Sequence, residues 1–200
     1  IAKREINFEE LNIDVQDAAM VKTIEDTLSS DDEIKQLFAL EIIEGLPLYS
    51  WKDTIQELFD NGSEDVRMRI LDMAWDETDI IPDENIISAI NKKDMVSPEA
   101  IITAGKRRLT NIYSDLESFL DEKNQEIVAA SAASIIMIES GPLEKAKKIL
   151  SEMLSSNEES IKATALKKLS DNDSILTNKK LIKFLKSNSG LISNVALTIS

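Results

Sequence analysis

The chain has 200 residues, of which 42% are apolar and 30% charged, so it can bury a globular core. It contains no Cys and no His, which excludes zinc sites built on these residues, a Ser-His-Asp triad and a Cys nucleophile. The net charge is −14, and residues 1–100 carry 9 basic and 25 acidic side chains. This balance argues against general affinity for nucleic acid or anionic lipid.

Residues 1–16 are predicted to form an extended lead-in or linker, because apolar residues nearly alternate in "INFEELNIDV". From residue 17 onward the apolar spacing is helical and is broken every 10 to 16 residues. Ser50, Ser97 and Ser114 are expected to cap helices, with Gly62 just beyond a helix end. The longest apolar run, residues 128–138, falls short of the roughly 20 residues that a membrane span needs.

Six positions share one local pattern: an apolar or small residue that follows a polar or acidic turn and opens a helix. Their spacings are 32, 34, 27, 34 and 30 residues, and they are Ile34, Val66, Ala100, Ile127, Ile161 and Leu191. A repeat near this period predicts stacked helix pairs, since one pair cannot bury its own apolar stripe. The expected domain covers residues 17–200, with repeats at 17–45, 46–78, 79–112, 113–141, 142–172 and 173–200. The last pair is expected to be truncated.

The segments "SEDVRMRILDMA" (residues 63–74) and "NEESIKATALKKL" (residues 157–169) resemble the HEAT repeat family. Both have an acidic turn, then an apolar residue followed by Arg or Lys, then small or apolar positions. The resemblance implies an all-α, right-handed α-solenoid of about six antiparallel helix pairs. The third and fourth repeats depart from it, with Ile101 and Val128 where Lys or Arg is expected.

The same resemblance suggests a ladder of ion pairs between repeats. Its predicted basic members are Lys35, Arg67 and Lys162, and its acidic members are Asp32, Asp65 and Glu159. The ladder is favoured over ligand binding, since exposed pairs of this kind are common.

Other charged and aromatic residues are candidates for contact with a partner. The predicted set is Arg69, Asp72, Trp75, Lys106, Arg107 and Arg108. The cluster at 106–108 could grip a phosphate or an acidic peptide, or could be a helix C-terminus favoured by the macrodipole. A row of lysines at 179, 180, 183 and 186 is a solvated helix face or a contact for the acidic half of another copy. Trp51 is expected to be a packing residue.

Three functions compete. The first is a non-catalytic scaffold that binds a protein or peptide on the concave face of the solenoid. The second is a soluble regulatory or assembly domain of a larger bacterial membrane protein, such as a transporter resembling ADP/ATP carriers, since both ends look cut from a longer chain. The third is an enzyme resembling HEAT-like DNA glycosylases or bilin lyases, which the acidic, aromatic-poor composition disfavours.

We therefore predict a protein that is not an enzyme and that has no cofactor and no metal. The expected partner is a protein or peptide rather than nucleic acid, and the sequence leaves the oligomeric state open. The expected location is the cytoplasm, including a cytoplasmic domain of an inner-membrane protein.

Overall fold

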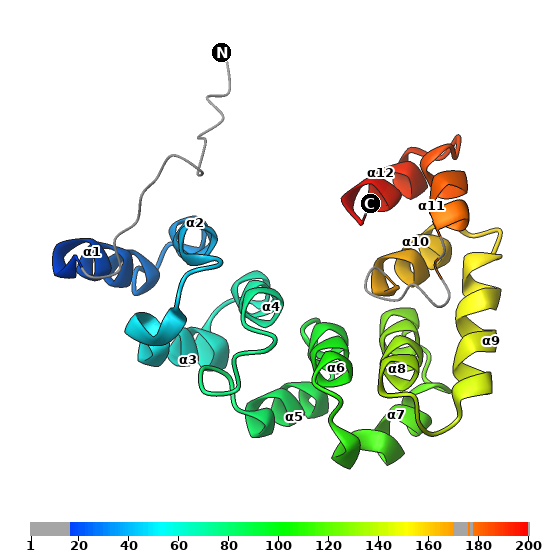
Figure 1. Ribbon diagram of the computed structural model, residues 1–200, viewed down its shortest axis with the longest axis horizontal. Coiled ribbons are helices and arrows are strands. Elements are labelled where there is room, and N and C mark those ends of the chain that lie inside the picture. Colours follow the sequence, from blue (N-terminus) through cyan, green and yellow to red (C-terminus); the bar gives the residue numbers. More distant parts are fainter. Residues whose placement is uncertain (1–16, 170–175, 177, 200) are drawn as a thin grey trace. The chain divides into compact units, whose positions relative to one another are not determined.

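The computed structural model describes residues 17–169, 176 and 178–199, and within these ranges every regular element is a helix. Figure 1 shows the coiled ribbons α1 to α12 following one another along the chain. The expectation of an all-α protein is confirmed. No helix within these ranges is both long enough and apolar enough to cross a membrane. The predicted lead-in at 1–16 lies outside the described residues.

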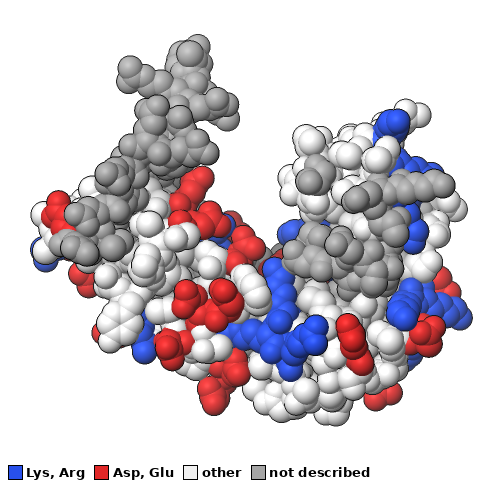
Figure 2. Space-filling view, in the orientation of Figure 1, with Lys and Arg blue, Asp and Glu red and all other residues white. Residues whose placement is uncertain are grey.

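The chain divides after Pro82 into two compact units, where the sequence pattern predicts one helical domain over residues 17–200. Residues 1–82 (unit 1) carry 7 basic and 21 acidic side chains, a net charge of −14. Residues 83–200 (unit 2) carry 16 of each sign. The entire net charge of the protein therefore belongs to unit 1, and on the face drawn in Figure 2 acidic side chains gather over its elements.

Over its described residues, 17–82, unit 1 contains two helix pairs and one short 3₁₀ helix. They are α1 (Ala18–Leu28), α2 (Glu33–Ile43), the 3₁₀ helix η2 (Leu48–Trp51), α3 (Lys52–Asn61) and α4 (Glu64–Met73). Helix α1 packs on α2, α3 packs on α4, and α2 also contacts α4. Asp17, Asp32 and Ser63 accept hydrogen bonds from the first backbone amides of α1, α2 and α4, so their side chains set where these helices begin.

Trp51 holds the start of α3 against α1. Its ring is buried, and its Nε1 donates to the carbonyl of Val21 at 3.1 Å, which confirms a packing role. The predicted N-cap of this helix is wrong, because Ser50 belongs to the preceding 3₁₀ helix and Trp51 holds the cap position. Gly62 directly follows the last residue of α3, as predicted, with an extended backbone at φ −70°.

In the part of unit 2 that the structure describes there are four helix pairs. They are α5 (Asp83–Lys92) with α6 (Ser97–Lys106), α7 (Tyr113–Phe119) with α8 (Gln125–Ile138), α9 (Leu143–Leu154) with α10 (Glu159–Lys168), and α11 (Asn178–Leu185) with α12 (Gly190–Thr198); a 3₁₀ helix η3 (Thr110–Ile112) precedes α7. The second helices contact one another in order, α6 with α8, α8 with α10 and α10 with α12. The core of unit 2 lies along this series.

Helix α8 is the centre of the unit 2 core, since 11 of its 14 residues are buried. A helix that is apolar all round has no face to give to solvent, so it must be covered by neighbours. Gly105 of α6 permits the closest approach: a Cβ there would lie 2.5 Å from Ser134 Oγ and 2.8 Å from Ser134 Cα. The Ser134 hydroxyl donates to the carbonyl of Ile101 at 2.8 Å and satisfies its own buried polar atom.

Two predicted caps in unit 2 are also wrong. Ser97 is the first residue of α6 rather than its cap, and its hydroxyl donates to the carbonyl of Ala89 at 3.0 Å. Ser114 lies inside α7. In neither helix does a serine side chain accept a hydrogen bond from the amides of the first turn. A 3₁₀ helix directly precedes α7, and Ser97 contacts the preceding helix α5 through Ala89.

Candidate functional site

A groove of about 900 Å³ lies in unit 2, where helices α9, α10, α11 and α12 meet. We call it the lysine groove, because four lysines line it: Lys162, Lys180, Lys183 and Lys186. Its apolar lining comes from Leu154, Ile182, Phe184 and Ile192, and three serines complete it. The groove therefore combines positive charge with apolar surface, the two properties that a binding site for an amphipathic acidic ligand requires.

Three of the groove lysines, Lys162, Lys183 and Lys186, are in none of the ion pairs described for unit 2. None of the described residues that line the groove is an Asp or Glu. Unit 2 has as many acidic as basic side chains, so the lack of carboxylates among the described lining residues is a local feature and not a consequence of composition.

The spacing of the lysines follows the face of one helix. Lys180, Lys183 and Lys186 are three residues apart, so at 1.5 Å per residue they extend over about 9 Å along α11 and the turn after it. Lys162 faces them from α10. The charge is thus spread along the groove rather than converging on one point.

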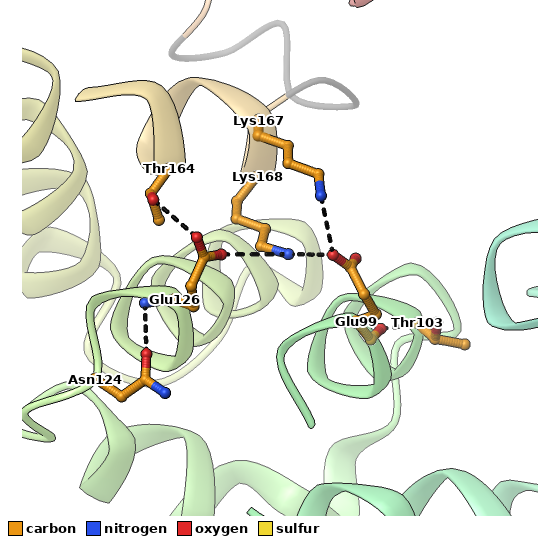
Figure 3. Close-up of polar contacts among 7 residues, drawn as sticks. All are labelled: Glu99, Thr103, Asn124, Glu126, Thr164, Lys167 and Lys168. Atoms are coloured by element: carbon orange, nitrogen blue, oxygen red, sulfur yellow. Dashed lines mark hydrogen bonds and ion pairs between the residues drawn. The ribbon is translucent and has the colours of Figure 1, made fainter. Parts of the chain in front are cut away.

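A second polar cluster lies among α6, α8 and α10 and is the buried ion network of Figure 3. Lys168 of α10 has a side chain only 3% exposed. Its Nζ donates to Glu99 of α6 and lies 3.7 Å from Glu126 of α8. The Thr164 hydroxyl donates to Glu126 at 2.8 Å, and Lys167 lies 3.6 Å from Glu99. The network joins three second helices of unit 2.

The carboxyl of Glu99 is held ionised by its neighbours. Burial by itself would raise its pKa, but the charges and hydrogen bonds of Lys168 and Lys167 outweigh burial and lower the pKa below the usual value. A buried ammonium needs such compensation, because an unpaired charge in the protein interior is costly. The network satisfies Lys168 internally, so we assign it a structural role.

The predicted ladder residues occupy different environments. Lys35 pairs with Asp32 at 3.7 Å across the first turn of α2, within one repeat rather than between repeats. Arg67 is buried, and its Nε donates to the carbonyl of Phe59 at 3.0 Å, which ties α4 to α3. Asp65 lies in the first turn of α4.

Of the two ladder residues predicted in the fifth repeat, one lines the lysine groove. Lys162 is one of the four groove lysines, and Glu159 lies in the first turn of α10.

Two of the predicted partner-binding residues form ion pairs inside unit 1. Arg69 of α4 pairs with Glu44 at the end of α2 and with Asp72 at 3.1 Å. The pair with Glu44 links α2 to α4, whereas the pair with Asp72 lies within α4, and the Arg69 side chain is 23% exposed. Trp75 follows α4 and remains 37% exposed.

The basic cluster at 106–108 ends α6. The Arg107 side chain is only 5% exposed and pairs with Asp83 at 2.9 Å, so it anchors the end of α6 to the start of α5. Arg108 has a left-handed backbone at φ +56°, which stops the helix. Lys106 is the last helical residue and is partly exposed. None of the three lines the lysine groove.

The sequence pattern identified part of the lysine groove but not the groove itself. The row at 180, 183 and 186 was visible as a periodic charge, although the side chain of Lys179 is not among those described. Nothing local links this row to Lys162, which is 18 residues earlier than Lys180. The burial of Lys168 could not be predicted from the sequence either, because lysines at a helix C-terminus are common on solvated surfaces.

Comparisons with protein-family models, with curated proteins and with solved structures find no match. The arrangement of residues in this chain therefore carries the functional argument.

Proposed function

We propose that this chain is a non-catalytic protein-interaction module built from stacked helix pairs of the HEAT type, and that the lysine groove is its docking surface. The main support for this proposal is the lysine groove. It is open and partly apolar, it lies at the meeting point of two helix pairs, and three of its lysines, Lys162, Lys183 and Lys186, are in no ion pair among the described residues.

The stacking part of the proposal is supported by where the helices begin. Each of the six repeat ranges contains two α-helices among the described residues. The second helix of each range begins one to three residues before its register position, at 33, 64, 97, 125, 159 and 190. Contacts between successive second helices within each unit agree with a repeat in which each pair is covered by the next.

The binding part is supported by apolar surface next to the lysines. Ile182 is 51% exposed within the groove, and Leu191, which precedes the groove residue Ile192, is 48% exposed. Large apolar side chains that stay exposed beside charged rims are typical of surfaces that a protein partner covers. A groove of this kind offers an anchor for one or two apolar side chains of a partner.

The test is site-specific photo-crosslinking with p-benzoylphenylalanine in cells of the source organism. The crosslinker replaces Ile182 in the groove, and a matched control replaces Met95, which is 67% exposed and lies outside it. We expect a discrete protein adduct from position 182 that is absent from position 95. The captured protein is then purified, and its binding is measured directly.

Charge reversal provides the specificity control. Lys183→Glu with Lys186→Glu should abolish the adduct from position 182. Lys92→Glu with Lys123→Glu changes the net charge by the same amount at exposed positions of unit 2 outside the groove, and should leave the adduct in place. Adducts that are equal at both crosslinker positions, or insensitive to the groove substitutions, would refute the proposal.

A further inference from the structure

We infer that the occupant of the lysine groove is an acidic segment of a polypeptide that carries at least one large apolar side chain. The inference rests on the proposed function and adds the chemical class of the partner. It follows from three features of the groove: the sign of its charge, the spacing of that charge and the apolar surface between the charges.

The sign of the charge selects an anionic ligand. Three groove lysines, Lys162, Lys183 and Lys186, have no carboxylate within ion-pair distance among the described residues. The ammonium groups of these three lysines repel one another, and that repulsion is relieved when carboxylates enter. Several other lysines of unit 2 already have acidic partners, as Lys145 has in Asp121 at 2.9 Å. The groove is thus a place where an external carboxylate gains charge pairing.

The spacing of the charge favours an extended ligand over a single phosphate. A phosphate site gathers donors around one point, often with arginine forks or backbone amides at a helix N-terminus. Here the charged donors are lysines only, and those of α11 and the turn after it are spread over about 9 Å. Lysine is a mobile point charge without fixed geometry, which suits a row of carboxylates on a peptide.

The apolar lining requires that the ligand also bury hydrocarbon. Leu154, Phe184 and Ile192 line the groove between the lysines, and Ile182 is half exposed. A volume of about 900 Å³ is near the upper end of ligand pockets and accommodates several side chains of a peptide. An apolar anchor flanked by acidic residues therefore matches both components of the lining.

Nucleic acid is the other large polyanion, and the observations disfavour it. Aromatic residues make up only 4% of the chain, and Phe184 is the one aromatic side chain among the described groove residues. Single-stranded nucleic acid is usually bound by several stacking aromatics along a basic channel. An acidic peptide needs no such platform.

The test measures fluorescence anisotropy with the full 200-residue chain and a labelled peptide of about 15 residues, the length of a typical docked helix. The probe contains Asp and Glu with Leu and Phe at spacings of three and four. Two matched peptides separate the components: one replaces every acidic residue with its amide, and the other replaces Leu and Phe with Ser. Inorganic tripolyphosphate and a single-stranded thymidine oligonucleotide serve as competing anions.

We expect the acidic apolar probe to bind, and both matched peptides to bind about tenfold more weakly or worse. The pair Lys183→Glu and Lys186→Glu should weaken the probe by about tenfold or more, and the pair Lys92→Glu and Lys123→Glu by less than about twofold. Far-UV circular dichroism checks that all variants remain folded. Self-association of the chain that the groove pair abolishes would also support the inference, because unit 1 of a second copy then supplies the acidic segment.

Three outcomes would overturn it: binding of the amide peptide as tight as that of the probe, tighter binding of tripolyphosphate, or tighter binding of the oligonucleotide. None of them removes the proposed function, because the groove-specific protein adduct at position 182 is an independent result. Loss of that adduct would remove the proposed function itself.

Discussion

Glu99→Gln tests whether the buried ion network stabilises unit 2. Lys168, with a side chain 3% exposed, lies between the carboxylates of Glu99 and Glu126. The substitution removes the nearer negative charge and keeps the size of the side chain. The ammonium is then left with Glu126 at 3.7 Å as its remaining charged partner in the network.

The expected cost is about 2–3 kcal/mol of unfolding free energy. Breaking a fully buried ion pair by removing one partner costs roughly 3–5 kcal/mol. We reduce that range because the Glu99 side chain is 25% exposed, the charge of Glu126 remains, and the amide of Gln still accepts a hydrogen bond. A loss of this size lowers the midpoint of thermal unfolding by about 4–12 °C in a chain of this length.

Urea unfolding followed by circular dichroism at 222 nm measures the effect. Glu144→Gln is the matched control, because the same chemical change removes an exposed pair with Lys147 at 3.2 Å. That control should cost less than about 0.5–1 kcal/mol. If Glu99→Gln costs no more than the control, the buried network does not stabilise unit 2 and our argument is wrong.

The opposite substitution, Lys168→Met, is expected to be milder. Methionine fits an apolar interior, and Glu99 keeps Lys167 at 3.6 Å and access to solvent. We expect a change within about 1 kcal/mol of the wild type, measured in the same urea experiment. If Lys168→Met loses more than about 3 kcal/mol of unfolding free energy, the ammonium of Lys168 is itself stabilising, and the cost of Glu99→Gln is not only that of leaving this ammonium unpaired.

Three further predictions concern packing and pH. Gly105→Ala should cost about 2–3 kcal/mol in urea unfolding, because its Cβ would lie 2.5 Å from Ser134 Oγ and force α6 away from α8. Trp51→Phe should cost about 1–3 kcal/mol by loss of volume and of the bond to the Val21 carbonyl, with Trp75 fluorescence as the probe of unit 1. The folded-state pKa of Glu99 is lowered, so its ionised carboxylate contributes fully to the unfolding free energy above the unfolded pKa of about 4.3. That contribution is lost as pH falls through the folded pKa. Glu99→Gln should therefore make the unfolding free energy fall less steeply at acidic pH. An unfolding free energy that falls as steeply at acidic pH in this variant as in the wild type would contradict the prediction.

The boundaries of several helices could be predicted from single residues, and others could not. Asp32 and Ser63 cap α2 and α4 through side-chain bonds to the next few amides, so local chemistry is sufficient there. Ser97 is not the predicted cap, because it is already the first residue of α6 and Val96 holds the cap position without a side-chain hydrogen bond. The Ser97 hydroxyl donates to the carbonyl of Ala89, eight residues away, a contact that the local sequence does not specify.

The candidate site shows the same division. The lysines on α11 could be recognised as a row, because their spacing matches a helix face. The basic cluster at 106–108 looked stronger in the sequence, yet Arg107 is 5% exposed and paired with Asp83, 24 residues away. A run of charges does not reveal which of them the fold has already neutralised.

The sequence by itself determined that this protein is helical and where its helix pairs begin, because helix periodicity and caps act over a few residues. Only the tertiary structure decided that Lys168 is buried between two carboxylates while Lys162, Lys183 and Lys186 line an open groove. All four are lysines on helices or at their ends, and they differ in which helices lie beside them. Contacts between distant segments set the burial and pairing of each lysine. They therefore decide whether its charge is compensated inside the fold or remains available to a partner.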